Sequence, residues 1–495
     1  MGAGRNGGRA ARRHPTCRRH ARVSHLESPE PRPCVRAGAP RRAGSSARLA
    51  ARALCERDSL AQLSIRSRGS DRRGRRPGGG LRRRIGARRR VVPSHWREPV
   101  GPAARQYSLR TVGERVRHSG IRAVTRRVRV LQVVHKLDYG GLERLVGAIV
   151  RLLPAERFES HILTLSDFGR FAEGLAAHAQ LHQHRSVPHL SMLWPRGLIR
   201  TIRALAPDAV HTHSGVWYKA SLAARRAGVR RLVHTDHGRP YPDSLKDRLL
   251  DGLAARRTDV IVAVSDALRR QMAETLVPRP SRIRVVVNGI DTRRFQPRAV
   301  NGSLRGELGL PVGAPVIGSI GRLDPIKGYD VMLQAFALLR ARWRVEEGAA
   351  PTLLLVGDGP ERARLAALIE REGLCDATRL VGWREDVEQV YPVFDVFSLS
   401  SWSEGTSLGL LEAMSCGVCP VVTAVGGSPA ALGEHLQHRL VPPGDPAALA
   451  DAWRDALTDD RRRAGDATMA RRRVEQAFGV EAMVREYARI YSEEL

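Results

Sequence analysis

The fold of this chain is indicated by residues 401–427, SWSEGTSLGLLEAMSCGVCPVVTAVGG. An apolar run precedes this stretch, and leucines and a methionine recur at helical spacing after its polar turn. Thr406 or Ser407 can cap that helix, and Cys416 with Gly417 can end it. A second apolar run follows at once. The stretch therefore predicts a strand, a turn, a helix and a second strand in immediate succession.

Two acidic residues of this stretch are candidates for a binding site. Glu404 lies in the polar turn and Glu412 lies on the helix, a separation of about 12 Å in helix rise. This exceeds the roughly 5–10 Å between the two carboxylates of a glycosidase, and it disfavours a pair that shares one proton. We expect the acids to hold two parts of one extended ligand, with a phosphate at the helix N-terminus between them. The alternative is an acidic turn and a solvated acid on a helix.

Apolar runs and helical patterns alternate along the chain after residue 127. Such alternation predicts parallel sheets that are covered by helices on both faces, and hence an α/β fold. The predicted strands are residues 128–134, 161–165, 209–213, 231–234, 260–264, 284–287, 316–321, 353–356, 379–381, 396–399 and 420–423.

Two loops with glycines follow predicted strands. Gly140 and Gly141 lie between the first strand and a helix, where a backbone without a Cβ can approach a phosphate. Many tight turns without a ligand have the same pattern. Arg322 and Lys327 lie together in the glycine-bounded loop 321–328, and a guanidinium with an ammonium can neutralise a pyrophosphate.

Histidines are concentrated at the ends of two other predicted strands, as His211 and His213 and as His234 and His237. Ligands bind at the carboxyl ends of parallel strands, and a neutral imidazole is a good hydrogen-bond partner for a sugar hydroxyl. No carboxylate or cysteine at ligand spacing accompanies them, so the pattern does not indicate a metal site. His237 is the principal candidate, with His213 and His135 as weaker ones. The alternative for each is a structural histidine.

Taken together, these motifs resemble those of the family 4 glycosyltransferases. The resemblance rests on Ser-x-x-Glu-Gly, Leu-Glu-Ala-Met, Gly-x-x-Pro-Val-Val and Val-Gly-Gly near residues 401–427, on Gly-Arg-Leu-x-x-x-Lys-Gly at 321–328, and on Thr-x-His-Gly at 235–238. It covers about residues 128–495. It implies the GT-B fold, in which two Rossmann-like domains with parallel sheets face each other across a cleft.

The resemblance also implies roles for individual residues. Arg322 and Lys327 would hold the donor diphosphate, and Glu412 would hold the ribose hydroxyls. Glu404 and His237 would contact the sugar. The catalytic candidates are therefore His237, Glu404, Arg322 and Lys327, and the donor-binding candidates are Gly140, Gly141, Arg322, Lys327, Arg384, Glu404, Gly405, Thr406, Ser407, Leu408 and Glu412, with His135, His213 and Asn288 as further candidates.

A retaining glycosyltransferase of the hexosyltransferase type is the activity that the resemblance implies. The donor would be a UDP- or GDP-sugar and the acceptor a glycan or a lipid-linked sugar, in cell-envelope or exopolysaccharide synthesis. The sequence contains no Asp-x-Asp, so we expect no metal and no other cofactor. One alternative is a sugar-nucleotide epimerase of the same architecture. Another is a nucleic-acid-binding protein that acts through a basic N-terminal arm.

The charge of the chain is distributed unevenly. Residues 1–127 contain 34 arginines, no lysine and seven acidic residues, and therefore carry +27 of the net +33. Such a segment has too few large apolar residues to offset its ordering entropy, so we expect it to be disordered and dispensable. We assign residues 128–300 to an acceptor-side domain, 301–478 to a donor-binding domain and 479–495 to a helix that crosses back. Specific nucleic-acid binding is not expected, because residues 128–495 carry only +6.

The sequence favours a cytoplasmic location. It contains no apolar run of 18 residues and no apolar signal segment at its start. Residues 128–300 carry +13 and residues 301–495 carry −7, so the first domain fits an anionic partner, such as the inner face of the cell membrane or an acidic glycan. A solvated basic face is the alternative. The basic residues that would supply the contact are Arg225, Arg226, Arg230, Arg231, Lys246, Arg248, Arg256 and Arg257.

Overall fold

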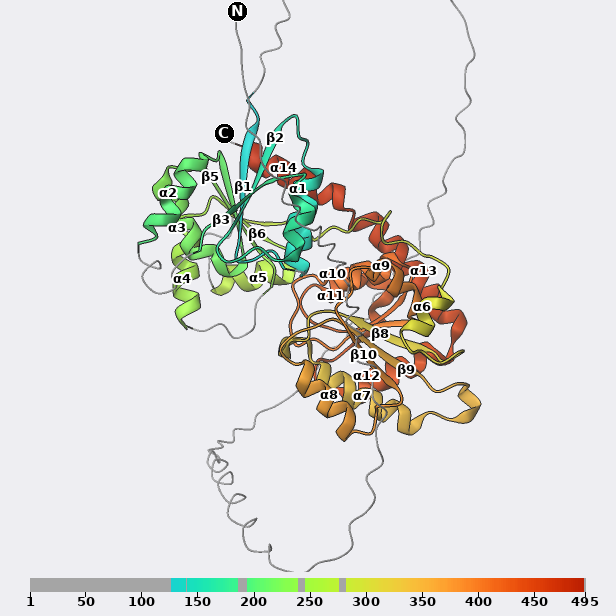
Figure 1. Ribbon diagram of the computed structural model, residues 1–495. Coiled ribbons are helices and arrows are strands. Elements are labelled where there is room, and N and C mark those ends of the chain that lie inside the picture. The colour runs from blue at the N-terminus through green and yellow to red at the C-terminus, as the bar shows by residue number, and fades with distance from the viewer. Residues whose placement is uncertain (1–125, 139, 186–193, 239–244, 276–281, 494–495) are drawn as a thin grey trace, which may run out of the picture. The chain divides into compact units, whose positions relative to one another are not determined.

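The computed structural model describes residues 126–138, 140–185, 194–238, 245–275 and 282–493, which belong to one compact unit of the chain, Glu114–Leu495. Residues 1–127 were predicted to be disordered. Residues 1–125 lie outside the described residues, so this stays a prediction. Two parallel β-sheets form the described part, and helices cover both faces of each (Figure 1).

The first sheet contains seven parallel strands in the order β3-β2-β1-β4-β5-β6-β7. Its central strands β1, β4 and β5 are largely buried because helices cover both faces of the sheet. In β1, VRVLQVV, the last five residues are all buried. The strands are β1 (Val128–Val134), β2 (Phe158–Thr164), β3 (Gln180–Gln183), β4 (Ala209–His213), β5 (Arg231–Asp236), β6 (Val260–Ala263) and β7 (Ile283–Val285).

Helices α1 and α14 cover one face of this sheet, and α2 and α3 cover the other. Ile149 of α1 and Ile490 of α14 lie in one apolar cluster with Val130, whereas Ile202 of α2 lies in another with Leu131. The helices of this part are α1 (Gly141–Leu152), η1 (Arg170–Leu175), α2 (Arg196–Leu205), η2 (Ser214–Val216), α3 (Trp217–Ala227), α4 (Leu245–Ala255), α5 (Asp266–Thr275) and α14 (Val480–Ser492).

The second sheet contains six parallel strands in the order β10-β9-β8-β11-β12-β13. Leu411 of α10 and Val474 of α13 pack in one cluster, and Met332 of α7 and Trp453 of α12 pack in the other. The strands are β8 (Val316–Ile320), β9 (Thr352–Val356), β10 (Thr378–Gly382), β11 (Val396–Leu399), β12 (Cys419–Thr423) and β13 (Leu440–Val441). The helices are α6 (Gly302–Glu307), η4 (Pro325–Lys327), α7 (Tyr329–Arg342), η5 (Val345–Glu347), α8 (Arg362–Arg371), α9 (Val387–Val390), η6 (Tyr391–Val393), α10 (Leu408–Ser415), α11 (Ser428–Leu432), η7 (Glu434–Arg439), α12 (Pro446–Thr458) and α13 (Asp460–Ala477).

The strand order reverses next to the first strand of each sheet. β1 lies between β2 and β4, and β8 lies between β9 and β11. Open parallel sheets bind ligands outside the carboxyl ends of their strands at such a reversal. Gly140 follows β1, Lys327 follows β8 and Glu404 follows β11. The topology therefore places these predicted site residues at the carboxyl edges where ligands bind.

The chain passes between the two sheets twice, and the two passages lie side by side. Ile290 and Gly479 form an isolated parallel bridge. The Ile290 N–H donates to the Phe478 oxygen at 2.7 Å, and the Val480 N–H donates to the Ile290 oxygen at 3.1 Å. A Cβ at Gly289 would lie 2.6 Å from the Val480 Cα. Only glycine fits there, and α14 starts from this point.

The predicted α/β fold with two parallel sheets is confirmed. The bounds of β1, β4 and β11 match those predicted, and several other strands differ by one to three residues. β3 and β13 were not predicted. Both lie at sheet edges and are short, and β3 reads QLHQ, which has no apolar run.

Candidate functional site

The loops after β8 and β11 bring a lysine and a glutamate together. Lys327 Nζ lies 2.7 Å from Glu404 Oε1, and the Ser401 hydroxyl donates to the same oxygen at 2.7 Å. The Ser400 hydroxyl donates to the backbone oxygens of Lys327 and Gly328, which fixes the lysine loop against the end of β11. A cation and an anion from two separate predicted motifs thus meet at one point.

Helix α10 begins at the predicted turn and is anchored to the first sheet. Ser407 caps it, because its hydroxyl oxygen accepts from the Leu410 N–H at 3.4 Å. The Thr406 hydroxyl instead donates to the Val264 backbone oxygen at 2.8 Å. Asn288 Nδ2 donates to the Thr406 backbone oxygen at 2.9 Å. The N-terminus of α10 is therefore fixed beside the carboxyl end of β6.

Two glycines allow the backbone of the loop that carries His237 to lie directly against the backbone of the loop that carries Glu404. A Cβ at Gly405 would lie 2.2 Å from the His237 backbone oxygen. One at Gly238, where φ is +112°, would lie 2.8 Å from the Gly405 nitrogen. No side chain fits at either position. The predicted histidine therefore lies directly against the turn that carries Glu404.

Glu412 is buried, so the alternative of a solvated helix acid is wrong. Only 1% of its side chain is exposed. Its two oxygens are bound by Arg144 NH1 at 2.6 Å and by the Tyr391 hydroxyl at 2.6 Å. Burial raises the pKa of Tyr391 well above its usual value, so the phenol remains a donor. Because Arg144 belongs to α1, this ion pair joins α1 to α10.

Helix α1 starts at the two predicted glycines, and its first turn lies near the start of α10. A Cβ at Gly141 would lie 3.5 Å from Leu408 Cδ1. The Glu143 carboxylate folds back over Gly140, 2.3 Å from where a Cβ would stand. Burial raises the pKa of Glu143 to about 7, and the positive charge of Arg322 opposes this shift. Two helix N-termini therefore approach each other, which is a favourable environment for an anion.

His237 is the most exposed member of a row of polar side chains that are joined by hydrogen bonds. Its Nε2 lies 3.1 Å from His213 Nδ1, and the two rings stack at 5.3 Å. His213 Nε2 lies 2.9 Å from Gln132 Oε1. Burial lowers the pKa of His237 to about 4, and it lowers the pKa of His213 well below its usual value. Both rings are therefore neutral at neutral pH.

The other predicted residues have different surroundings. Arg322 is exposed on its loop, and His135 is exposed after β1. The guanidinium of Arg384 binds Asp386 at 2.7 Å and Glu307 at 2.6 Å, and these hydrogen bonds raise its pKa. Arg322 Nε lies 3.7 Å from Asp324 Oδ2, but 72% of the Arg322 side chain is exposed and available to a ligand, whereas Arg384 is held by two carboxylates of the protein.

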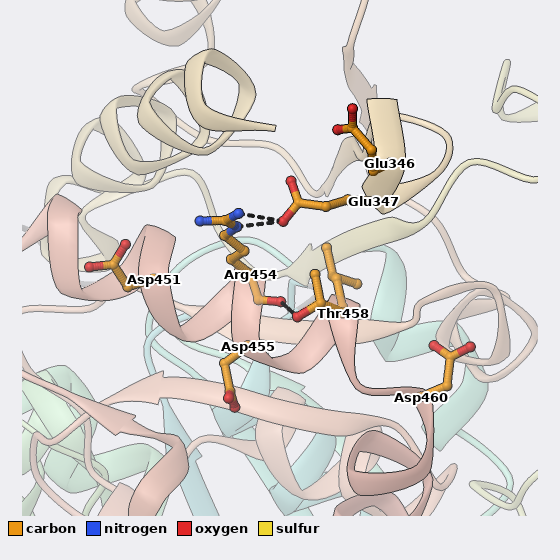
Figure 2. Close-up of a pocket in the computed structure, with 8 residues that line it drawn as sticks. Glu346, Glu347, Asp451, Arg454, Asp455, Thr458 and Asp460 are labelled. Carbon is orange, nitrogen blue, oxygen red and sulfur yellow. Dashed lines mark hydrogen bonds and ion pairs between the residues drawn. The ribbon is translucent and has the colours of Figure 1, made fainter. Parts of the chain in front are cut away.

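A pocket of about 640 Å³ lies elsewhere, beside α12, and no predicted site residue lines it (Figure 2). Arg454 binds Glu347 there at 2.6 Å. The lining residues are Glu346, Glu347, Asp451, Arg454, Asp455, Leu457, Thr458 and Asp460. Within the described ranges, no three His, Cys, Asp or Glu side chains are arranged to hold a metal ion. Among the helices of those ranges, none is both long and apolar enough to cross a membrane.

Four residues around this site were not predicted. They are Arg144, Tyr391, Gln132 and Tyr491, and none of them belongs to a motif that marks a binding site. One signal was available for Gln132, because an amide within the apolar run VRVLQVV needs a buried partner. The partner itself comes from the far end of the chain, where no spacing pattern points to it.

Two family profiles match the chain. The one described as Glycosyltransferase Family 4 matches residues 139–294, and the one described as Glycosyl transferases group 1 matches residues 314–459. These ranges contain all the predicted catalytic candidates. The matches also include Arg144, Tyr391 and Glu412, whereas Gln132 lies outside both ranges.

Curated relatives and solved structures agree with the profiles. The D-inositol 3-phosphate glycosyltransferase of Stackebrandtia nassauensis is 30% identical over 343 residues, which are 63% of this chain and 72% of the relative. That of Corynebacterium urealyticum is 35% identical over 227 residues, which are 44% of this chain and 52% of the relative, so the match spans only about half of that protein. The structure of Anabaena HepE in complex with UDP-glucose has a TM-score of 0.65 at 24% identity, covers 73% of this chain and 99% of its own, and shows a shared fold. The chain therefore belongs to the family 4 glycosyltransferases and has the GT-B fold.

Proposed function

We propose that the protein is a retaining glycosyltransferase that moves a sugar from a UDP- or GDP-sugar to a glycan or lipid-linked acceptor. The observation that carries the proposal is the meeting of Lys327 and Glu404 beside the N-termini of α1 and α10. The reaction needs a cation that stabilises the leaving diphosphate and a side chain that accepts hydrogen bonds from the hydroxyls of the sugar. It is also favoured by helix N-termini, whose dipoles attract an anion. The UDP-glucose held by Anabaena HepE supports this class of donor.

In this proposal, Lys327 and Arg322 stabilise the negative charge that develops on the leaving diphosphate. Glu404 orients Lys327 and accepts hydrogen bonds from the sugar. The backbone of residues 405–408 lies against the phosphate and the sugar. The two basic side chains take the place of a metal ion, in line with the absence of Asp-x-Asp from the sequence.

Ribose binding by Glu412 requires an exchange of partners. A carboxylate can accept about four hydrogen bonds, but Arg144 and Tyr391 already bind this one and leave almost none of it exposed. We propose that the ribose hydroxyls displace Arg144 while Tyr391 stays in place. The Arg144 guanidinium is then free to meet the phosphates at the start of α1.

A panel of nucleotide sugars tests the donor. We expect either the UDP-sugars or the GDP-sugars to raise the melting temperature of the full chain, because a ligand at 100 times its Kd stabilises the native state by about 2.7 kcal/mol. Differential scanning fluorimetry measures the shift, and Glu404→Gln is the matched control because it keeps the size of the side chain but loses its charge. A panel that shifts neither protein, or shifts both equally, contradicts the proposal.

We also propose that the first domain contacts the anionic inner face of the cell membrane, as a cytoplasmic enzyme of cell-envelope or exopolysaccharide synthesis. Helix α4 supports this: Leu245 is 82% exposed and Leu249 is 66% exposed, and Lys246 and Arg248 are exposed beside them. Asp247 lies between the two basic residues, and the exposed leucines beside them fit the boundary of an anionic bilayer.

Two of the predicted basic residues face inward. The prediction that Arg231 belongs to the basic face is wrong, because its side chain is buried and binds Glu493 at 3.0 Å. Arg225 is half-buried and binds Asp259 at 2.5 Å. Both guanidiniums hold strands and helices together, whereas Arg226, Arg230 and Arg256 are exposed, as are Lys246 and Arg248 of α4.

Co-sedimentation with lipid vesicles tests this contact. We expect the full chain to bind anionic vesicles and the variant Leu245→Ser/Leu249→Ser to bind them more weakly, because the apolar anchors are lost. A further variant, Lys246→Glu/Arg248→Glu, should lose about 1 kcal/mol or more for each basic residue removed. Equal binding by all three proteins would contradict the role of α4, because they share residues 1–127 and the other exposed arginines of the first domain.

A further inference from the structure

The row of polar side chains that starts at His237 ends on the C-terminal helix α14. Gln132 Nε2 donates to the Tyr491 hydroxyl oxygen at 3.1 Å. The same oxygen lies 2.6 Å from His211 Nδ1, and His211 Nε2 lies 2.7 Å from Thr235 Oγ1. All of these side chains except His237 are fully buried or nearly so. The last helix of the chain is therefore connected to the proposed catalytic histidine through hydrogen bonds.

The donors and acceptors of this row can be assigned from Gln132. Its oxygen can only accept, so His213 donates from Nε2. A neutral His213 then has a bare Nδ1, which accepts from Nε2 of His237. A neutral His237 with its proton on Nε2 has a lone pair on Nδ1. That nitrogen can accept a hydrogen bond from a hydroxyl group.

The orientation of Gln132 depends in turn on Tyr491. The Gln132 amide group donates to the tyrosine oxygen, and the tyrosine proton is then directed to His211 Nδ1. If the amide turned over, its NH₂ group would face His213 and its oxygen would face Tyr491. Each group in the row would then have to reverse its role, because no buried donor can be left unpaired without a penalty. Hydrogen-bond direction is thus a property of the whole row.

We infer that Gln132 and Tyr491 are positioning residues, which hold His237 in the tautomer that carries its proton on Nε2 and offers Nδ1 as an acceptor to a hydroxyl of the donor sugar. The inference rests on the proposed function for the identity of that hydroxyl. The tautomer itself is a property of the free protein and is independent of any substrate.

Nitrogen-15 spectroscopy of the histidine rings tests the inference without substrate. In the full-length protein we expect His237 to show one protonated nitrogen, Nε2, and one bare nitrogen, Nδ1. In Tyr491→Phe the ring packing stays but the hydroxyl is lost, so both amide orientations of Gln132 become populated and the two nitrogens of His237 should show averaged shifts. If about half of the molecules hold the wrong tautomer, kcat/KM for transfer falls about twofold.

Tyr487→Phe is the matched control. Tyr487 lies on the same helix and is also buried, and its hydroxyl lies 3.0 Å from Thr235 Oγ1, at the far end of the row. Loss of that hydroxyl does not reverse the direction of the hydrogen bonds between Gln132 and His237, so the single tautomer of His237 should persist. A proton on Nδ1 in the unaltered protein, or an unchanged His237 spectrum in a folded Tyr491→Phe, overturns the inference. If the tautomers behave as expected but no nucleotide sugar supports transfer, the proposed function fails and the positioning role stands.

Discussion

Replacing Lys327 by alanine is expected to lower kcat/KM for sugar transfer by about 30- to 1,000-fold, which corresponds to about 2–4 kcal/mol of transition-state stabilisation. The ammonium lies 2.7 Å from Glu404 and its loop is fixed by the Ser400 hydroxyl, so it is held in place before the donor arrives. Donor-diphosphate charge develops mainly as the glycosidic bond breaks. The loss should therefore appear more strongly in kcat than in donor affinity, and steady-state kinetics with calorimetry separates the two. Arg322→Ala should have a loss of similar size.

Two controls distinguish this role from a general effect of charge. Lys219→Ala removes a lysine from α3, outside the proposed donor site, and should leave kcat/KM unchanged. Lys327→Arg keeps the charge but replaces a compact ammonium by a wider planar group, so partial recovery is expected. Rates within threefold of the unaltered protein for Lys327→Ala would show that this lysine does not stabilise the leaving group.

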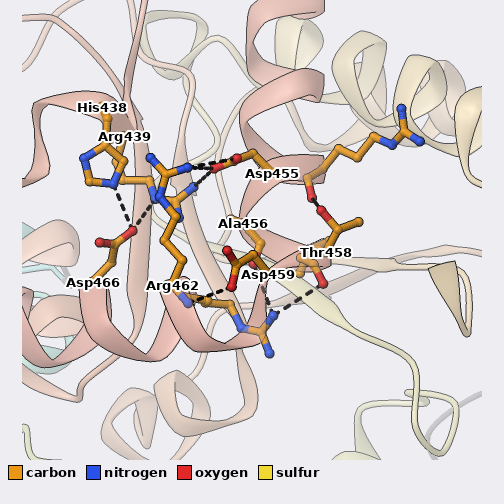
Figure 3. A network of polar contacts seen from close by, with 11 residues as sticks. His438, Arg439, Asp455, Ala456, Thr458, Asp459, Arg462 and Asp466 are labelled. Carbon is orange, nitrogen blue, oxygen red and sulfur yellow. Dashed lines mark hydrogen bonds and ion pairs between the residues drawn. The ribbon is translucent and has the colours of Figure 1, made fainter.

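Replacing Asp466 by alanine is expected to lower the free energy of unfolding by up to about 3–5 kcal/mol, because the buried guanidinium of Arg439 loses the more buried of its two carboxylate partners. Arg439 has 0% of its side chain exposed and Asp466 has 3%, and Arg439 Nε lies 2.7 Å from Asp466 Oδ2. Figure 3 shows that His438 reaches the same carboxylate, while a second carboxylate, Asp455, binds the far side of the guanidinium. After the substitution, Asp455 alone faces Arg439. Urea unfolding followed by fluorescence measures the change.

Asp451→Ala is the matched control for this prediction. Asp451 also pairs with an arginine, Arg342, at 3.0 Å, but 67% of its side chain is exposed. An exposed pair of this kind contributes about 0–1 kcal/mol. A similar loss for the two variants would mean that burial does not decide the strength of the pair between Arg439 and Asp466.

The approximate bounds of most strands along the chain could be predicted because buried parallel strands are rich in apolar residues. β1, VRVLQVV, and β11, VFSL, are mainly apolar, whereas only the first two residues of β4, AVHTH, are apolar; the predicted bounds of all three were correct. β3 could not be predicted in this way, because an edge strand is covered on fewer sides and QLHQ has no apolar pattern to distinguish it from a loop. The cap of α10 was left open between Thr406 and Ser407, since the choice depends on Val264, a residue far away in the sequence.

The site was predictable where its residues lie in short motifs at strand ends, as Lys327 and Glu404 do. The partners of these residues were not. Arg144 binds Glu412 across more than 260 positions of sequence, and no periodicity connects an arginine on one helix with a glutamate on another. The same holds for Tyr491, whose hydroxyl lies 359 positions from the amide of Gln132. Local sequence patterns predict which residues lie at the edge of a sheet. The side chains that each of these residues contacts there are determined by the tertiary fold.

Because α14 follows the second sheet in the sequence but packs on the first sheet, the first sheet can be covered fully only late in translation. The face of the first sheet that includes Val130 and Val233 is covered by Tyr487 and Ile490 of this helix. A ribosome makes β1 near the start of the described chain and α14 at its end. All seven strands of the first sheet are therefore made, and so is the whole of the second sheet, before α14 can join α1 in covering that face. The domain that is synthesised first is completed late, and the part of its apolar face that Tyr487 and Ile490 cover is exposed to chaperones and to aggregation until α14 has been made.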